Sequence, residues 1–425
     1  MHAKQRRVHT GEGTAVVFSF LYFFCVLASY YVIRPVREQL SAAVGSTQLP
    51  WFWLGTFVAT LVLTPVFGWM TVRWPRRIFV PAVYVFFAAC LVGFVPLFTS
   101  SGLLSPRALG IVFFVWVSTF NLFVVSVFWS FMADIWDNEQ ARRLYPVIGL
   151  GGVAGSVCGP LLTEQLVGVI GVAPLLVVSA LLLFGALACV LWLGRWADRY
   201  GARRHEAGNA AAVGGGMFDG LKQVFTQPFI RNMALLMLLG DCIGTVGYVL
   251  MTDYSHATFV ADAVARTRFA ARVDAVTNIT QIIVQLTVTR WLLVRWGASA
   301  PIGAWAVASV AVLLATAMSA TPFVPVLWVF PWAVLALIVT RSLSYGMVGP
   351  ARESLYTRVP RELRYQGKNA VDTAVWRAGD VVVATSMNGL RALGMGVPGF
   401  ALLAGLAAAT SGWIGWRLAR LTERS

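Results

Sequence analysis

The stretch that decides the fold is RWADRYGARRHEAGNAAAVGGGMFDGLKQ, residues 195–223. It is too charged to cross a bilayer, and its centre is rich in glycine and alanine, like a linker. Six apolar runs of about twenty residues lie on each side of it, and a helix of that length spans the hydrocarbon core, which is about 30 Å thick. The sequence therefore predicts an all-α polytopic membrane protein with about 12 transmembrane helices.

The apolar runs also predict how the chain is divided. The predicted spans before the polar stretch are 14–39, 51–72, 77–98, 107–133, 144–170 and 173–194. Those after it are 228–252, 272–294, 299–320, 324–349, 370–392 and 397–418. We therefore predict an N-terminal six-helix bundle at 1–194, a cytoplasmic linker at 195–227 and a C-terminal six-helix bundle at 228–425.

Composition excludes a water-soluble protein. Of the 425 residues, 58% are hydrophobic and 12% are charged, and the mean hydropathy is +0.73. Soluble domains have about 25% charged residues. Most of the surface is therefore expected to contact the lipid bilayer, which is the first predicted partner.

The net charge of +15, from 33 basic and 18 acidic residues, predicts membrane orientation rather than nucleic-acid binding. Lys and Arg are retained on the cytoplasmic side during insertion. Here they gather in alternate loops and helix ends, namely 4–7, 73–77, 142–143, 195–222, 290–295, 352–368 and 417–424. Both termini are therefore expected to be cytoplasmic. Segment 253–272 is the main exception and is expected to be a short external amphipathic element.

The cysteines and histidines argue against an enzyme. All five cysteines lie in apolar runs without a CxxC pair, and the four histidines fall in predicted tails or loops. Neither a metal site nor a catalytic centre is predicted from such a distribution. We expect no cofactor and no obligate protein partner.

Charges inside a predicted span cost at least about 2.5 kcal/mol each on insertion scales, so each needs a reason. Arg34, Arg37 and Glu38 lie at the outer end of the first span, where Pro35 is expected to disturb the helix. Arg34 and Glu38 are four residues apart and can pair. A guanidinium here can bind an anionic substrate with two hydrogen bonds. The alternative is an anchor that reaches the membrane interface.

The junction between the fourth and fifth spans carries a predicted gate. Its charged residues are Asp134, Glu139, Arg142 and Arg143. Downstream, Gly151, Gly155 and Gly159 recur every four residues and place glycine on one helix face, where another helix can approach closely. Ordinary packing of small residues is the alternative to a gating role.

The start of the eleventh span carries Lys368, Asp372, Arg377 and Asp380. Lys368 and Asp372 are spaced to form one ion pair, and Arg377 and Asp380 are spaced to form another. We expect the two basic residues to contact substrate and the two acids to contribute to a gate, with neutral packing pairs as the alternative. Asp241 has no charged residue nearby in the sequence. It is the candidate for carrying a coupling proton, unless it pairs with an arginine of another helix.

Three of these segments resemble the non-mitochondrial ATP/ADP translocases and their bacterial relatives. The resemblance covers Arg34, Arg37, Glu38 and Leu40; Phe128, Trp129, Phe131, Asp134, Ala141, Arg142, Arg143, Tyr145, Pro146 and Gly149; and Gly367, Lys368, Asp372, Arg377 and Gly379. Pro35 replaces an aspartate of the family pattern. The resemblance implies a major facilitator-like fold, a bacterial cytoplasmic (inner) membrane location, and exchange of nucleotides held through their phosphates.

The expected function is secondary active transport of an organic anion, such as a nucleotide or another phosphate-bearing metabolite, by alternating access. Two alternatives remain. The first is a proton-coupled exporter of an amphipathic compound or lysolipid, in which Asp241 matters most. The second is a membrane-embedded enzyme or scaffold without transport.

Overall fold

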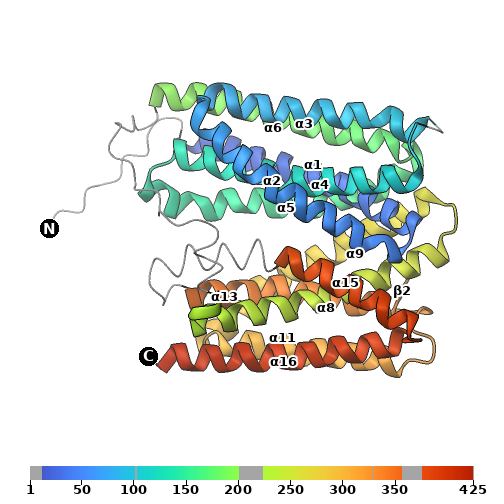
Figure 1. The fold of residues 1–425 in the computed structure, drawn as a ribbon. Helices are drawn as coiled ribbons and strands as arrows, with labels where there is room; N and C mark the ends of the chain where they lie inside the picture. Colours follow the sequence, from blue (N-terminus) through green and yellow to red (C-terminus); the bar gives the residue numbers. More distant parts are fainter. Residues whose placement is uncertain (1–11, 101–102, 201–223, 328, 357–375, 425) are drawn as a thin grey trace. The chain divides into compact units, whose positions relative to one another are not determined.

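The computed structural model describes residues 12–100, 103–200, 224–327, 329–356 and 376–424 (Figure 1). The chain divides into two compact units. Unit 1 comprises Met1–Glu38, Ala59–Ala207 and Ala263–Ala275, and unit 2 comprises Gln39–Val58, Gly208–Asp262 and Val276–Ser425. Each unit therefore includes a short segment from the other half of the sequence. The division into bundles at 1–194 and 228–425 stays a prediction.

The first half of the chain forms six long helices. They are α1 (Glu12–Val44), α2 (Leu49–Arg73), α3 (Arg76–Thr99), α4 (Pro106–Ile135), α5 (Asn138–Ile170) and α6 (Ala173–Tyr200), with a 3₁₀ turn η1 (Ser46–Gln48) after α1. Their ends follow local chemistry. Ser105 caps α4 by accepting a hydrogen bond from the Ala108 amide at 3.2 Å. Asp137 and Gln140 form a capping box at the start of α5.

The second half has more interruptions. Its elements are α8 (Pro228–Thr258), α9 (Ala263–Val284), η2 (Gln285–Thr289), α10 (Arg290–Trp296), α11 (Ser299–Met318), β1 (Pro325–Leu327), β2 (Phe330–Pro331), α12 (Trp332–Leu343), η3 (Ser344–Val348), α13 (Gly349–Tyr356), α15 (Trp376–Ala392) and α16 (Val397–Arg424). The strands β1 and β2 form a small antiparallel hairpin. The π-helical turns η2 and η3 interrupt two otherwise continuous helices.

Ten helices among the described residues are long and apolar enough to cross a membrane. The two remaining predicted spans coincide with α9–η2–α10, which carries several arginines, and with α15, of which 17 residues are described. The chain is a multi-pass membrane protein, and its all-α class is confirmed.

The structure adds detail to two local expectations. Segment 253–272 is mostly helical, because α8 continues to Thr258 and α9 begins at Ala263. Two arginines of α9 have defined neighbours in α5, because Arg272 pairs with Glu164 and Arg268 lies against Gly168. Helix α1 also continues through Pro35 to Val44. A proline in the middle of a membrane helix removes one backbone hydrogen bond, which neighbouring helices can offset.

In unit 1, helix α5 packs closely on α1 through glycine. A side chain at Gly155 would come within 2.9 Å of the Ala28 amide nitrogen, and one at Gly159 would meet the Ala28 carbonyl oxygen at 2.9 Å. Gly151 faces the Phe20 carbonyl even more closely. The stripe at 151, 155 and 159 therefore lies against α1, where larger residues would push the helices apart. Figure 1 shows α3 and α6 side by side in the same unit, in agreement with their contacts.

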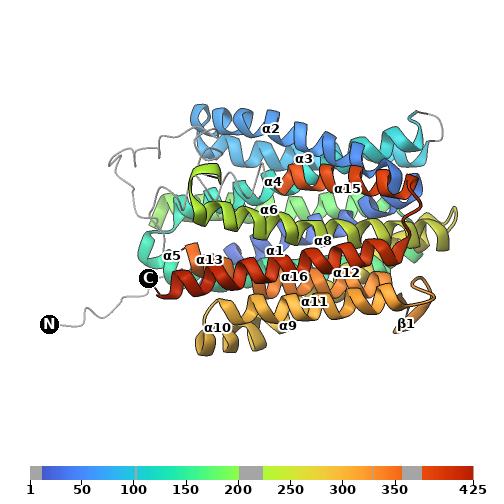
Figure 2. The same ribbon diagram turned by 60° about the horizontal axis from the view of Figure 1, so that its bottom comes forward.

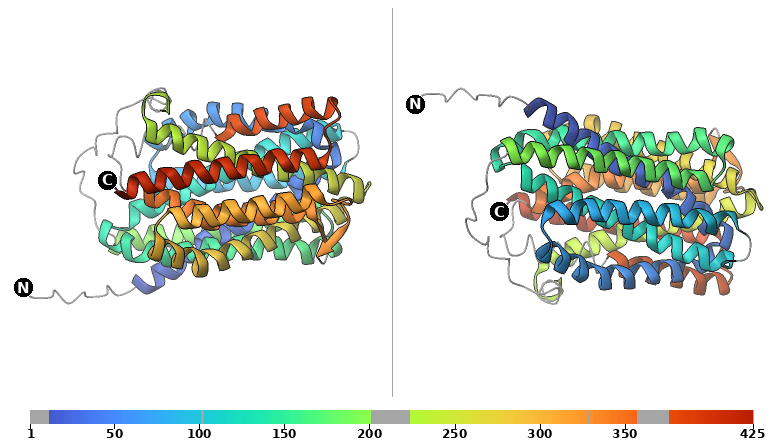
Figure 3. Two further views of the ribbon diagram at one scale, coloured as in Figure 1. Left: turned by 90° about the horizontal axis from the view of Figure 1, so that it is seen from below. Right: turned by 90° about the horizontal axis from the view of Figure 1, so that it is seen from above.

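In unit 2, helix α16 packs against both α8 and α11 (Figure 2; Figure 3, left). The closest approach is again at glycine. A side chain at Gly412 would overlap the Ala306 Cβ, and one at Gly415 would lie 2.8 Å from Ile302 Cγ2. A core of buried side chains from α8, α11, α13 and α16 surrounds this contact. The arrangement fixes α11 and α16 in an antiparallel pair.

Candidate functional site

Helix α1 carries a buried group of charges in unit 1. The Nη1 atom of Arg34 lies 3.3 Å from Oδ1 of Asp274, and its Nε atom lies 3.6 Å from Oε1 of Glu38. Nη2 of Arg37 donates a hydrogen bond of 2.5 Å to the same Glu38 oxygen. We call these four residues the Arg34 cluster. Two cations and two carboxylates give it no formal net charge.

The Arg34 cluster is shielded from water. The exposed fractions of its side chains are 10% for Arg34, 11% for Arg37, 3% for Glu38 and 7% for Asp274. Arg37 also donates a hydrogen bond of 3.4 Å to the Ser118 hydroxyl, and its guanidinium lies 4.6 Å from the centre of the Phe114 ring. Charges in such surroundings are held by one another and by aromatic faces rather than by lipid headgroups. The anchor alternative for Arg34 does not fit this burial.

Sequence reasoning did not include Asp274 in the site. It lies in the first half of α9, about 240 positions after Arg34 and within a predicted span. A carboxylate inside a predicted membrane span requires a cationic partner, and this requirement could have drawn attention to Asp274. Spacing identified the Arg34–Glu38 pair, whereas the Arg34–Asp274 pair required the tertiary structure.

The first half of α9 makes further contacts in unit 1. Nη2 of Arg272 lies 2.6 Å from Oε1 of Glu164 in α5, and its Nε atom donates to the same oxygen at 2.8 Å. The Arg268 side chain lies against Gly168, also in α5. These contacts explain why basic residues are accommodated in α9. They hold a segment of the second half of the sequence against helices of the first half.

The predicted gate residues of α4 and α5 are placed near the helix ends. Asp134 has its Oδ2 atom 3.7 Å from Nη1 of Arg76 at the start of α3. Arg143 forms an ion pair with Glu12 at the start of α1. Glu139 is exposed in the first turn of α5, where a carboxylate stabilises the helix dipole. The side chain of Arg142 lies outside the described residues. The ion pairs of Asp134 and Arg143 therefore join α4 to α3 and α5 to α1.

In unit 2, two predicted residues with different expected roles lie at the same helix contact. The Thr245 hydroxyl of α8 donates a hydrogen bond of 2.9 Å to Oδ1 of the buried Asp380 in α15. A side chain at Gly379 would lie 3.5 Å from Oδ2 of Asp241, which is half-buried in α8. Asp241 and Asp380 therefore both line the α8–α15 contact. Lys368, Asp372 and the Arg377 side chain lie outside the described residues.

A second charged group in unit 2 was missed by sequence reasoning. Arg391 of α15 forms an ion pair with Asp253 of α8, and the Ser46 hydroxyl donates a hydrogen bond to that carboxylate. Nη1 of Arg391 donates to Ser46 Oγ at 2.6 Å. We call Ser46, Asp253 and Arg391 the Asp253 cluster. The exposed fractions of the Arg391 and Asp253 side chains are 23% and 26%.

Two more contacts hold the same part of the chain. Nδ1 of His256 donates a hydrogen bond of 2.7 Å to the Ala42 carbonyl, and Nδ2 of Asn388 donates one of 2.8 Å to the Thr47 carbonyl. His256 was expected in a loop but lies in the last turn of α8. The end of α1 and the turn after it are thus attached to α8 and α15.

No family model matches the chain, and no curated protein matches it in sequence. Solved structures match it along nearly its whole length. The POT family transporter PepTSo has a TM-score of 0.67 at 13% identity, with 97% of this chain and 99% of that chain covered. The nucleoside transporter NupG has a TM-score of 0.63 at 13% identity, with coverage of 97% and 99%. The fold is major facilitator-like.

A third similar structure is the inward-open xylose transporter XylE from E. coli, with a TM-score of 0.57 at 14% identity and coverage of 97% of this chain and 96% of that chain. The fold prediction is therefore confirmed. The finer resemblance to ATP/ADP translocases stays a prediction, because identities this low are informative about fold alone.

Proposed function

We propose that the protein is a secondary active transporter for a small organic anion, with a nucleotide or another phosphate-bearing metabolite as the leading candidate. The observation that carries the proposal is the Arg34 cluster, two arginines buried in a transmembrane helix of a major facilitator-like fold. Arginine binds phosphate and carboxylate groups through two parallel hydrogen bonds. Ionisable groups within membrane spans mark solute pathways more often than they serve packing.

Competition for guanidinium groups gives the proposed mechanism. An arriving anion would replace Asp274 at Arg34 and Glu38 at Arg37, because each guanidinium has a limited set of donors. A charge-assisted hydrogen bond contributes about 1.5–3 kcal/mol, which is enough to bind and weak enough to release. Since Arg34 and Asp274 belong to different halves of the sequence, substrate binding would loosen the attachment of α9 to α1.

The charge balance favours co-transport of the anion with a proton. The Arg34 cluster is neutral without substrate, so adding an anion gives the site a net negative charge that is costly in a low-dielectric region. A proton that accompanies the anion compensates this charge, and the neutral empty site can return without a substrate. Co-transport of the anion with a proton is therefore the simplest coupling for this site.

We also propose a membrane orientation and a division of roles among the charged residues. The two six-helix bundles would rock against each other, with both termini in the cytoplasm of a bacterial cell and the chain in its inner membrane. The proposed gate residues are Asp134, Glu139, Arg142, Arg143, Asp372 and Asp380. Lys368 and Arg377 are proposed to contact substrate together with Arg34, Arg37 and Glu38. Reagent labelling of single cysteines introduced near each terminus, in intact cells and in inverted vesicles, tests the orientation.

A ligand screen tests the anion proposal directly. Purified protein in detergent is heated with nucleotides, sugar phosphates, dicarboxylates and lysolipids, and thermal shifts are followed by counterflow in liposomes. An anion that raises the melting temperature should lose its effect in Arg34→Lys and in Lys368→Ala. The control Arg417→Ala removes an exposed arginine of α16 and should keep the shift. Equal shifts in all these proteins would refute the proposal.

Proton-coupled export of an amphipathic compound is the second candidate. It is favoured by Asp241 and Asp380, which both line the α8–α15 contact. Two carboxylates in one buried region readily share a proton, because both cannot be charged at low cost. Asp241→Asn should then abolish pH-dependent uptake while leaving counterflow exchange intact. An unchanged pH profile would remove this candidate.

A further inference from the structure

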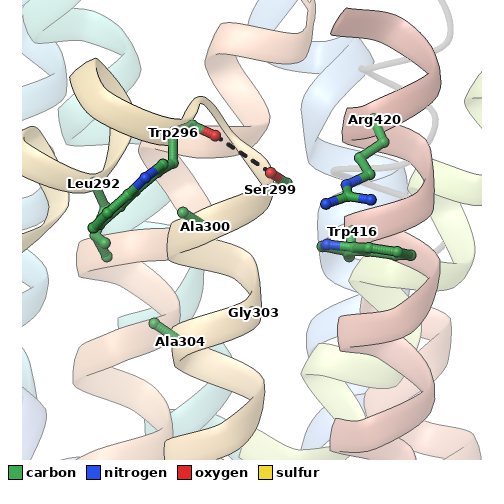
Figure 4. Close-up of a pocket in the computed structure, with 8 residues that line it drawn as sticks. All are labelled: Leu292, Trp296, Ser299, Ala300, Gly303, Ala304, Trp416 and Arg420. Carbon is green, nitrogen blue, oxygen red and sulfur yellow. Dashed lines mark hydrogen bonds between the residues drawn. The ribbon is translucent and has the colours of Figure 1, made fainter.

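A groove lies on unit 2, away from the residues discussed above. It has a volume of about 780 Å³ and is lined by side chains of α10, α11 and α16. Figure 4 shows Arg420 and Trp416 on one side of the groove and Trp296 with Leu292 on the other. Trp296 and Trp416 are 50% and 38% exposed, so both rings are open to the surroundings of the protein.

Cations and indole rings are arranged together at this groove. The Arg420 guanidinium lies 4.3 Å from the centre of the Trp416 ring, which keeps it extended over the opening. On the other side, the Arg295 guanidinium lies 5.4 Å from the Trp296 ring. Tryptophan and arginine together are typical of the membrane–water interface, where the ring lies at headgroup level.

The floor of the groove is formed by small residues of α11, namely Ala300, Gly303 and Ala304. A side chain at Gly303 would meet no atom within 4 Å. At the nearby Gly412 and Gly415, the space that a side chain would need is instead occupied by Ala306 and Ile302. The helices α11 and α16 are therefore tightly packed at Gly412 and Gly415, whereas Gly303 borders open space in the groove.

The charged residues of α10, α11 and α16 are mostly basic. Helices α10 and α11 contain no acidic residue, and Glu423 is the only one in α16, whereas Arg290, Arg295, Arg417 and Arg420 are basic. Helix α11 begins at Ser299 without a side-chain cap, so its first amides add partial positive charge. The Ser299 hydroxyl donates a hydrogen bond of 3.4 Å to the Trp296 carbonyl. An occupant of this groove should therefore combine an anionic head with an apolar tail.

We propose that the groove binds one anionic phospholipid. Its phosphate would contact Arg420 and the first turn of α11, and one acyl chain would lie over Gly303 and Ala304. Basic pockets between membrane helices recognise anionic headgroups in this way. The site needs no transported substrate, so it stands apart from the proposed function.

Native mass spectrometry of the delipidated full-length protein tests the proposal. The protein is titrated with dioleoyl phosphatidylglycerol and separately with dioleoyl phosphatidylcholine. Phosphatidylglycerol should bind more tightly, and Arg420→Gln should weaken it about fivefold, the effect of one basic residue near a membrane surface. The matched control is Arg417→Gln, because Arg417 stacks on Trp413 at 5.6 Å and does not line the groove. It should cause no comparable loss.

A second variant tests the acyl-chain part. Gly303→Phe fills the open space and should abolish the preferred lipid-bound species. Gly93→Phe, at another position where a side chain meets no atom within 4 Å, should leave that species unchanged. Equal binding of the two lipids, equal loss in both arginine variants, or displacement of phosphatidylglycerol by millimolar inorganic phosphate would each overturn the proposal.

Discussion

The Arg34 cluster in unit 1 and the Asp253 cluster in unit 2 are built from the same chemistry in different surroundings. Each joins a segment of the first half of the sequence to one of the second half. The side chains of the Arg34 cluster are 3–11% exposed, whereas Arg391 and Asp253 are 23% and 26% exposed. Breaking a buried pair leaves an uncompensated buried charge, but breaking a partly exposed pair lets water reach both partners.

This difference indicates two kinds of contact. The Arg34 cluster should open only when a ligand replaces one of its carboxylates. The Asp253 cluster should open and close at little cost, as a contact that changes in each transport cycle must. Four variants test the distinction, in order of decreasing effect.

Arg34→Ala should have the largest effect. It leaves Asp274 buried without its cation, and loss of one partner of a buried pair costs about 3–5 kcal/mol. We expect a markedly lower melting temperature and no anion uptake. Arg34→Lys should recover most of the stability but little of the uptake, because lysine cannot form two parallel hydrogen bonds. Wild-type stability of Arg34→Ala in a thermal melt would contradict the burial argument.

Gly155→Leu tests whether α5 fixes the helix that carries the Arg34 cluster. Its Cβ would lie 2.9 Å from the Ala28 amide, so α1 and α5 must separate. Overpacking of this kind costs about 1–3 kcal/mol. Gly149→Leu is the control on the same helix, because a side chain there meets no atom within 4 Å. Equal denaturation midpoints for the two variants would show that α1 is not held by this stripe.

Asp274→Asn removes the carboxylate that we propose to compete with substrate for Arg34. If the anion replaces Asp274, binding should strengthen about tenfold, which corresponds to ~1.4 kcal/mol. Isothermal titration with the best ligand of the screen measures the change. Glu164→Gln, which alters the other carboxylate facing α9, is the control and should leave the affinity unchanged. Weaker binding in Asp274→Asn would mean that Asp274 positions Arg34 rather than competing for it.

Asp253→Asn should have the smallest effect on stability. Exposed ion pairs contribute about 0.2–1 kcal/mol and are screened by salt, and this partly exposed pair should lie nearer that range than a buried pair does. The denaturation midpoint should change little and the remaining difference should shrink in high salt. A loss as large as that of Arg34→Ala would remove the contrast between the two clusters.

Much of the fold followed from local sequence patterns. Apolar run length located the membrane helices, and the four-residue repeat of Gly151, Gly155 and Gly159 predicted a helix face that others can approach. The Arg34–Glu38 pair followed from a spacing of one helical turn. The contacts that accommodate Arg268 and Arg272 of α9 against α5 did not follow from local patterns.

Partners far apart in sequence could not be predicted in this way. Neither the periodicity nor the composition relates Arg34 to Asp274 or Asp253 to Arg391. The same holds for the placement of Asp241 and Asp380 at one helix contact. The role of His256 was hidden for the same reason, since its hydrogen-bond acceptor is a backbone carbonyl of α1.

The sequence by itself determined that the chain crosses the membrane many times and that it carries costly charges within its helices, because hydrophobic length and charge are properties of each segment. Only the tertiary structure decided which carboxylate neutralises which arginine and how deeply each pair is buried. Those outcomes depend on the distances between helices, and no single segment contains that information.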